Sequence, residues 1–203
     1  MNAQERKAAI VEAAVRLFAE KGFRGATTRE LAGAVGVTEP VLYEHFETKR
    51  DLYRAIIDAK SQDGCNRFHA LVAPYMEMDD DRGFFQKLAE LILEFYEANP
   101  DYIRLLMFSG LEGHELAEQF YERHRDTFFR VVTGYLEGRM KKGAFRKMDP
   151  KLATRAFTGM VANYALSRIL FKHGALKAGR KRVIQGMADI FLNGISIRRN
   201  GRQ

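Results

Sequence analysis

Three observations predict an all-α fold for this chain of 203 residues. Nearly every segment places apolar residues three and four positions apart, which puts them on one face of a helix. No segment alternates apolar and polar residues between hairpin-type turns, as a half-buried strand would. Breakers divide the chain into roughly nine helices, three or four of them short and N-terminal. These breakers lie at Gly22, Gly36, 79–81, 99–100, 109–113, 143–150 and 174–179.

Composition limits the class of protein. With 46% hydrophobic residues, the chain can bury a core. The single cysteine, Cys65, excludes an intrachain disulfide and a cysteine-based metal framework, so we expect a cytoplasmic location and no metal or cofactor. The N-terminus carries charges before any long apolar run, and no later stretch is apolar enough to cross a bilayer. We therefore expect neither a signal peptide nor a membrane partner.

The net charge of +7 is distributed unevenly along the chain. Residues 1–60 hold 10 basic and 9 acidic residues, residues 61–137 hold 7 and 15, and residues 138–203 hold 16 and 2. The basic excess is therefore C-terminal, where it forms either a solvated face or a second nucleic-acid site. The net charge of the first 60 residues alone therefore does not indicate DNA binding.

An apolar stripe predicts the first helix. Its members recur at the spacing of one helix face, and Gly22 follows them as a C-terminal stop. They are Ile10, Ala13, Ala14, Leu17 and Phe18.

Capping signals predict the starts of the second and fourth helices. Thr27 and Glu30 are spaced as a capping box, in which each side chain accepts a hydrogen bond from a backbone amide near the other residue. Thr48 with Asp51 marks the start of the fourth helix in the same way. The second helix has a short buried face and ends at Gly36, where glycine can adopt the left-handed conformation. That face is Leu31, Ala32 and Val35.

The segment 36–38 has the length of the turn in a helix-turn-helix, and Thr38 is placed to cap a third helix that begins at Glu39. Leu42 and Phe46 lie one turn apart and can pack inward. Rotation of about 100° per residue then directs a short face of the third helix outward. This face comprises Pro40, Val41 and Glu44, with Tyr43 and His45 on its flanks.

The N-terminal quarter resembles the TetR family of transcriptional regulators. The resemblance combines LFAEKGF at the end of the first helix, TTRELA, the GV turn, LYEHF in the third helix and the following TKRDL. It implies a DNA-binding domain over residues 1–64, with the helix-turn-helix at about 27–46, and an effector-binding and dimerisation domain over residues 65–203. By the resemblance, the start of the second helix and three later side chains contact the DNA backbone, while 38–41 approach bases. The backbone contacts are Thr27, Thr28, Arg29, Tyr43, His45 and Lys49; the base contacts are Thr38, Glu39, Pro40 and Val41.

Each of these side chains also has a purely structural interpretation. Thr27 is a good helix cap whether or not it contacts DNA. Arg29 and Lys49 could be solvated charges, and Tyr43 could lie partly in the core. A histidine beside an aromatic residue, as at His45, is more often a packing residue than a metal ligand, and no second ligand lies at metal-site spacing. For these residues other than Thr27 we favour the DNA contact, because all of them fall within one docking geometry.

Glu39 and Glu44 depart from this pattern, since a phosphate repels a carboxylate that does not accept a hydrogen bond from a cytosine amino group. We expect them to sharpen the choice of DNA sequence. Because the first 60 residues carry almost no net charge, useful binding should require two half-sites held by a dimer.

The second part of the chain is rich in phenylalanine and methionine. Plain core packing explains any one of these residues, but the resemblance implies a ligand cavity among the middle helices, and such linings suit a small hydrophobic effector. The candidate pocket residues are Phe85, Leu88, Phe95, Arg104, Met107, Phe108, His124, Phe128, Met160, Asn163 and Tyr164.

The last two helices, expected at about 150–172 and 180–198, mix small with large apolar residues. Small residues let helices approach closely. By the resemblance, these two helices form a homodimer interface, although the same pattern could serve packing within one chain.

The function that follows is a homodimeric repressor that an effector releases from double-stranded operator DNA. An enzyme is the first rival, but the five histidines show no catalytic spacing, and we expect no catalytic residue. The second rival is an architectural or partner-binding helical protein that uses its basic C-terminal face. Neutralising Arg180, Lys181 and Arg182 would abolish binding under that second alternative.

Overall fold

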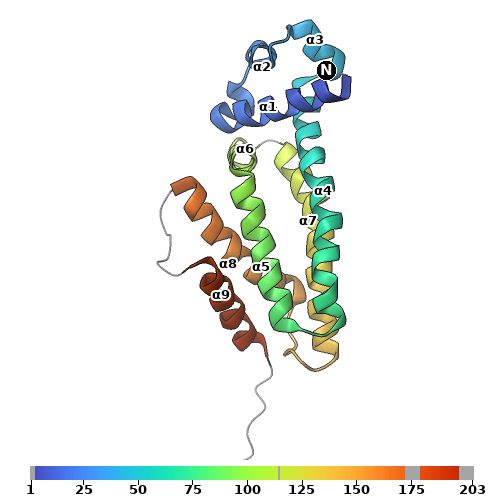
Figure 1. The fold of residues 1–203 in the computed structure, drawn as a ribbon, viewed down its shortest axis with the longest axis vertical. Coiled ribbons are helices and arrows are strands. Elements are labelled where there is room, and N and C mark those ends of the chain that lie inside the picture. Colours follow the sequence, from blue (N-terminus) through green and yellow to red (C-terminus); the bar gives the residue numbers. More distant parts are fainter. Residues whose placement is uncertain (1–2, 114, 172–178, 197–203) are drawn as a thin grey trace, which may run out of the picture. The chain divides into compact units, whose positions relative to one another are not determined.

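The computed structural model describes residues 3–113, 115–171 and 179–196, and the side chains of these residues except at positions 3, 57, 60–67 and 115–127. The side chains of Cys65 and His124 therefore lie outside the described residues. The described residues are almost entirely helical, which confirms the all-α prediction (Figure 1). The helices are α1 (Ala3–Gly25), α2 (Thr28–Val35), α3 (Glu39–His45), α4 (Lys49–Glu77), α5 (Asp81–Ala98), α6 (Pro100–Leu111), α7 (Glu115–Lys141), α8 (Pro150–Phe171) and α9 (Arg180–Ile195).

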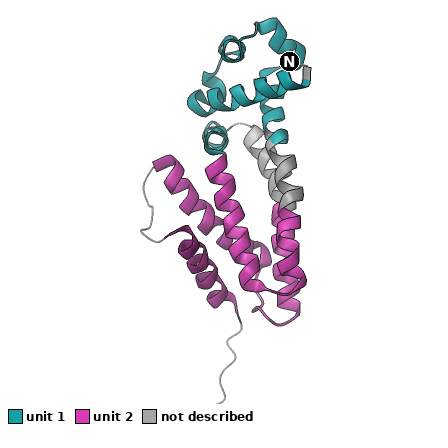
Figure 2. Cartoon of the chain, in the orientation of Figure 1, with its two compact units in different colours: residues 1–64, 99–124 teal, residues 65–98, 125–203 magenta. Residues whose placement is uncertain are grey.

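The chain divides into two compact units (Figure 2). The first unit consists of residues 1–64 and 99–124, and the second consists of residues 65–98 and 125–203. α6 groups with the N-terminal helices because it packs along α1. The first unit thus includes a segment that lies far beyond the N-terminal region in the sequence.

The first unit buries the apolar stripe that the sequence predicts on α1. Ile10, Ala14 and Phe18 are fully buried, and the helical backbone breaks at Gly22, which has a φ of 71°. One further turn continues from this break to Gly25. The predicted stop at Gly22 is therefore confirmed as a break in the helix rather than as its last residue.

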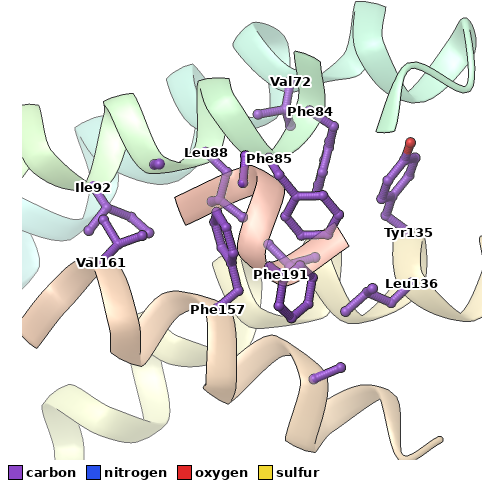
Figure 3. Close-up of a cluster of buried hydrophobic side chains, with 14 of the residues drawn as sticks. Val72, Phe84, Phe85, Leu88, Ile92, Tyr135, Leu136, Phe157, Val161 and Phe191 are labelled. Carbon is purple, nitrogen blue, oxygen red and sulfur yellow. The ribbon is translucent and has the colours of Figure 1, made fainter. Parts of the chain in front are cut away.

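The second unit is built around α5, which packs against both α8 and α9. Figure 3 shows the buried side chains that these helices share with α4 and α7. The ring of Phe85 lies 4.8 Å from the rings of both Phe157 and Phe191, and Phe84 stacks on Tyr135 at 4.0 Å. Aromatic pairs at these distances add to the free energy gained from burying apolar area. The phenylalanine-rich segments therefore form a closely packed core.

A polar cluster holds the turn between α4 and α5 to the last turns of α7. The guanidinium of Arg139 donates to both oxygens of Asp81, at 2.7 and 2.8 Å, and forms an ion pair with Asp79 at 2.8 Å. The hydroxyl of Tyr135 donates to Asp81 at 2.7 Å. A hydrogen bond from Lys142 lowers the pKa of the Asp79 carboxyl. This turn is thus fixed by paired charges.

A search of the described helices for a membrane-spanning segment finds none with the necessary length and apolar character.

Candidate DNA interface

The start of α2 is a complete capping box. The side chain of Thr27 accepts from the amide of Glu30 at 3.2 Å, and the carboxylate of Glu30 accepts from the amide of Thr27 at 2.9 Å. Hydrogen bonds from the Lys21 side chain and from Thr27 lower the pKa of Glu30 to about 2. The capping role predicted for Thr27 is therefore confirmed, and its contact with DNA stays a prediction.

The turn between α2 and α3 depends on Gly36, whose φ of 73° lies in the left-handed region. Its amide and that of Val37 donate to carbonyls of the last turn of α2. Thr38 then occupies the N-cap position of α3, but its side chain makes no capping hydrogen bond. The predicted side-chain cap is therefore wrong: Pro40 at the second helical position has no amide, and Thr38 does not accept from the amide of Val41 at the third.

The face of α3 that the sequence predicts as protruding is accessible in the structure. Leu42 and Phe46 are buried, and the residues between and before them remain exposed or half-buried. Those residues are Pro40, Val41, Tyr43, Glu44 and His45. α3, held by buried Leu42 and Phe46, therefore exposes the side chains that the sequence predicts to contact DNA.

Glu39 joins the first turn of α3 to the first turn of α2. One of its carboxylate oxygens accepts from the Thr28 hydroxyl at 2.9 Å, and the other accepts from Nε of Arg29 at 3.3 Å. The structure thus brings three of the residues predicted to contact DNA together in one cluster, in which Arg29 is exposed and Thr28 and Glu39 are half-buried.

Lys49 turns toward the end of α1. Its ammonium donates to the carbonyl oxygen of Phe23 and lies 4.3 Å from the centre of the Phe23 ring. Burial lowers the pKa of Lys49. These contacts give Lys49 a structural role, and its contact with phosphate stays a prediction.

Glu112, at the end of α6, is a residue that the sequence analysis missed. Its two carboxylate oxygens accept from the amides of Phe23 and Arg24 at 3.2 and 3.4 Å. A side chain at Gly22 would place its Cβ 2.4 Å from Glu112 Oε1, so the carboxylate requires glycine there. Phe23 and Glu112 lie 89 positions apart in the sequence, and no local pattern indicates that they are in contact.

A second contact fixes α6 within the first unit. The Tyr53 hydroxyl of α4 donates to the carbonyl of Leu105 at 3.2 Å, and burial raises the pKa of this tyrosine. The Tyr53 ring also packs edge-on against Phe18 and Phe23 at 5.3 and 5.5 Å. α6 therefore braces the helix end that precedes α2.

The residues predicted to line an effector pocket fall into both units. Arg104, Met107 and Phe108 belong to α6 in the first unit, whereas Phe85 and Leu88 are fully buried in the core of the second. Others lie around that core: Phe128, Met160 and Tyr164 pack against it, Phe95 is half-buried and Asn163 is exposed. The effector pocket stays a prediction.

The second unit also carries an apolar groove between α8 and α9. Leu152 and Ile190 are 65% and 70% exposed beside it, which is unusual for large aliphatic side chains. Met148, Ala156, Met160 and Gly194 complete much of its lining.

Two family models match the chain. The model for "Bacterial regulatory proteins, tetR family" matches residues 10–56, which include all of α2 and α3. The model for "AefR-like transcriptional repressor, C-terminal domain" matches residues 85–194, more than half of the chain. The chain belongs to the TetR family. It is a sequence-specific DNA-binding transcriptional regulator, and this family consists of regulatory proteins rather than enzymes.

Known proteins are similar to most of this chain. The chain is 34% identical over 143 residues to the nucleoid occlusion factor SlmA of Marinobacter nauticus, covering 68% of this chain and 70% of the relative. It is 30% identical over 154 residues to the HTH-type transcriptional repressor KstR2 of Rhodococcus jostii, covering 74% and 73%. The solved structure of the fatty acid degradation regulator FadR from Bacillus halodurans shares the fold, with a TM-score of 0.73 at 20% identity over 95% of this chain and 97% of that one.

Proposed function

We propose that this TetR-family protein is a homodimeric repressor whose operator DNA is bound by α2 and α3 of each protomer and released by a small hydrophobic effector. The observation that carries the proposal is the exposed face of α3, held outward by buried Leu42 and Phe46. A helix presented in this way fits the major groove, where its first residues meet base edges.

In this proposal α2 and α3 contact different parts of the DNA. The first turn of α2 contacts the DNA backbone, the first turn of α3 reads bases, and the flanks of α3 contact phosphates. The backbone and phosphate contacts are Thr27, Thr28, Arg29, Tyr43, His45 and Lys49; the base-reading residues are Thr38, Glu39, Pro40, Val41 and Glu44.

The homodimer forms through α8 and α9 in this proposal. The exposed Leu152 and Ile190 support it, because a two-fold axis would bury each of them against a second copy of the same groove. We expect Ile190→Asp to convert the dimer to a monomer in analytical ultracentrifugation and to weaken operator binding. A dimeric Ile190→Asp variant would place the interface elsewhere, and a monomer with full affinity would contradict the need for two half-sites.

The effector acts by preferring the conformation that does not bind operator, since only differential affinity shifts a population. In this proposal phenylalanine and methionine side chains supply the hydrophobic lining, and residues 65–203 form the effector-binding and dimerisation domain. A hydrophobic compound that binds tightly but leaves operator affinity unchanged is not the effector.

The contacts of Arg180 weigh against DNA binding by the basic C-terminal face. Its guanidinium donates to Glu97 at 2.7 Å and forms an ion pair with Glu94 at 3.6 Å, and Arg168 shares Glu97 at 3.0 Å. Part of the basic excess is therefore neutralised within the second unit.

Fluorescence anisotropy with a duplex from immediately upstream of the gene tests the proposal. The test variant is Tyr43→Ala, His45→Ala, and the control is Lys181→Ala, Arg182→Ala, which removes two charges from α9. We expect the test variant to lose about 10- to 100-fold in affinity. The control should change less than about threefold, apart from a smaller salt dependence. The reverse result would assign DNA binding to the C-terminal face.

A further inference from the structure

The carboxylate of Glu39 occupies two hydrogen-bond donors that the start of α2 presents. One oxygen takes the hydroxyl of Thr28, and the other takes Nε of Arg29. The cluster lies at the surface, because the side chain of Arg29 is 90% exposed and that of Glu39 is 35% exposed. DNA that approaches this face meets a carboxylate already bound to the two donors.

An exposed pair of this kind can be exchanged at little cost. Ion pairs between solvent-exposed side chains contribute little to stability, so a DNA phosphate can replace the carboxylate on Arg29. The displaced carboxylate then lies close to a phosphate, which repels it. A cytosine amino group removes this penalty, because it donates a hydrogen bond that a glutamate can accept in the major groove.

We propose that Glu39 is a specificity-determining residue that keeps Thr28 and Arg29 from phosphate until a cytosine amino group takes their place on its carboxylate. The proposal rests on the function proposed above, which directs α2 at the DNA backbone and the first turn of α3 at bases. At a site that offers the cytosine, Thr28 and Arg29 donate to phosphate, and the Glu39 carboxylate accepts from the cytosine amino group. At any other site the carboxylate competes with phosphate for Thr28 and Arg29.

Glu47 provides a matched control two residues beyond α3. It is exposed, carries the same charge, and is not among the residues proposed to contact DNA. Among the contacts of the described residues, none joins Glu47 to Thr28 or Arg29. Glu47→Gln therefore repeats the change in net charge and leaves the cluster intact.

The experiment uses a duplex selected by the wild-type protein from a random pool. It is compared with duplexes in which single C·G pairs are replaced, and with a scrambled duplex of the same composition. Affinities of wild type, Glu39→Gln and Glu47→Gln are measured by anisotropy over a salt series, and circular dichroism checks that each variant is folded.

We expect Glu39→Gln to bind the scrambled duplex about tenfold more tightly than wild type and with a steeper salt dependence, because Arg29 becomes available to phosphate. Glu47→Gln should gain less than about threefold. One C·G replacement should weaken wild type about tenfold and leave Glu39→Gln nearly unaffected.

Equal gains for the two variants would assign the effect to net charge and overturn the proposal. Loss of affinity for both selected and scrambled duplexes in a folded Glu39→Gln variant would do the same, because Glu39 would then only orient α2. A wild-type protein that does not prefer the selected duplex would instead reject the proposed function, and this inference with it.

Discussion

The helix ends of the first unit are held by carboxylates near the surface, whereas the corresponding tie of the second unit is a largely buried arginine. Glu112 holds backbone amides at the end of α1, and Glu39 holds Thr28 and Arg29. The side chain of Arg139, which joins α7 to the α4–α5 turn, is only 13% exposed. By the proposal above, a DNA phosphate replaces the Glu39 carboxylate on Arg29, whereas the buried guanidinium of Arg139 keeps its partners. The comparison thus separates a contact that can change partners from one that fixes a turn.

The apolar cores of the two units also differ. The second unit packs the aromatic rings of α5, α7, α8 and α9 into one continuous cluster. The first unit combines smaller aliphatic anchors with a group of three rings, Phe18, Phe23 and Tyr53, beside its polar ties. We therefore expect substitutions in the second core to have the largest effects on stability.

Truncation of Leu88 tests how much the core of the second unit contributes to stability. Leu88 is fully buried, and we expect Leu88→Ala to lower the free energy of unfolding by about 2–5 kcal/mol through lost contacts and a residual cavity. Leu111→Ala is the matched control, because Leu111 is 86% exposed and should change stability by less than about 0.5 kcal/mol. Chemical denaturation at fixed protein concentration measures both. Similar losses in the free energy of unfolding for the two variants would contradict the expected difference between a buried and an exposed leucine.

Gly22 tests the tie between α1 and Glu112. We expect Gly22→Ala to cost about 2 kcal/mol, since alanine is strained at a positive φ and its Cβ would displace the carboxylate. Gly33 is exposed within α2 with open space around it, so Gly33→Ala should stabilise by up to about 1 kcal/mol. Opposite signs in thermal unfolding would show that the break in α1 requires glycine. A neutral Gly22→Ala variant would show that neither the positive φ nor the position of the Glu112 carboxylate excludes a side chain there.

The pH dependence of the Glu30 cap is the smallest expected effect. Folding lowers the pKa of Glu30 from 4.5 to about 2, so its stabilisation is complete above about pH 4.5 and is lost as the pH falls toward 2. The Tm of Glu30→Gln should therefore lie below that of wild type at pH 5–7, with a gap that narrows below pH 4.5. A gap that stays constant down to pH 3 would assign the effect to packing.

Local signals explain what the sequence could predict. The Thr27–Glu30 capping box, the left-handed Gly36 and the burial of Leu42 and Phe46 depend on residues a few positions apart, so pattern alone locates them. Together they define α2, the turn and the exposed face of α3.

Contacts between distant segments escaped prediction for the same physical reason. No pattern near Glu112 indicates that it binds the end of α1, and nothing near Lys49 shows that its ammonium turns toward Phe23. Nor does the sequence distinguish a pocket lining from a core, because buried Phe85 and an effector-binding phenylalanine would share one apolar pattern. The grouping of residues 99–124 with the N-terminal helices depends on the same distant contacts.

The contact between Glu112 and Phe23 also limits when the first unit can finish folding during synthesis. The two residues are separated by 89 positions, so at about 5–20 residues per second the ribosome adds Glu112 about 4–18 s after Phe23. After His45 has been added, the nascent chain carries every residue of α3 but still lacks the carboxylate that holds the end of α1. The N-terminal unit therefore completes its structure only after α6 has left the ribosome.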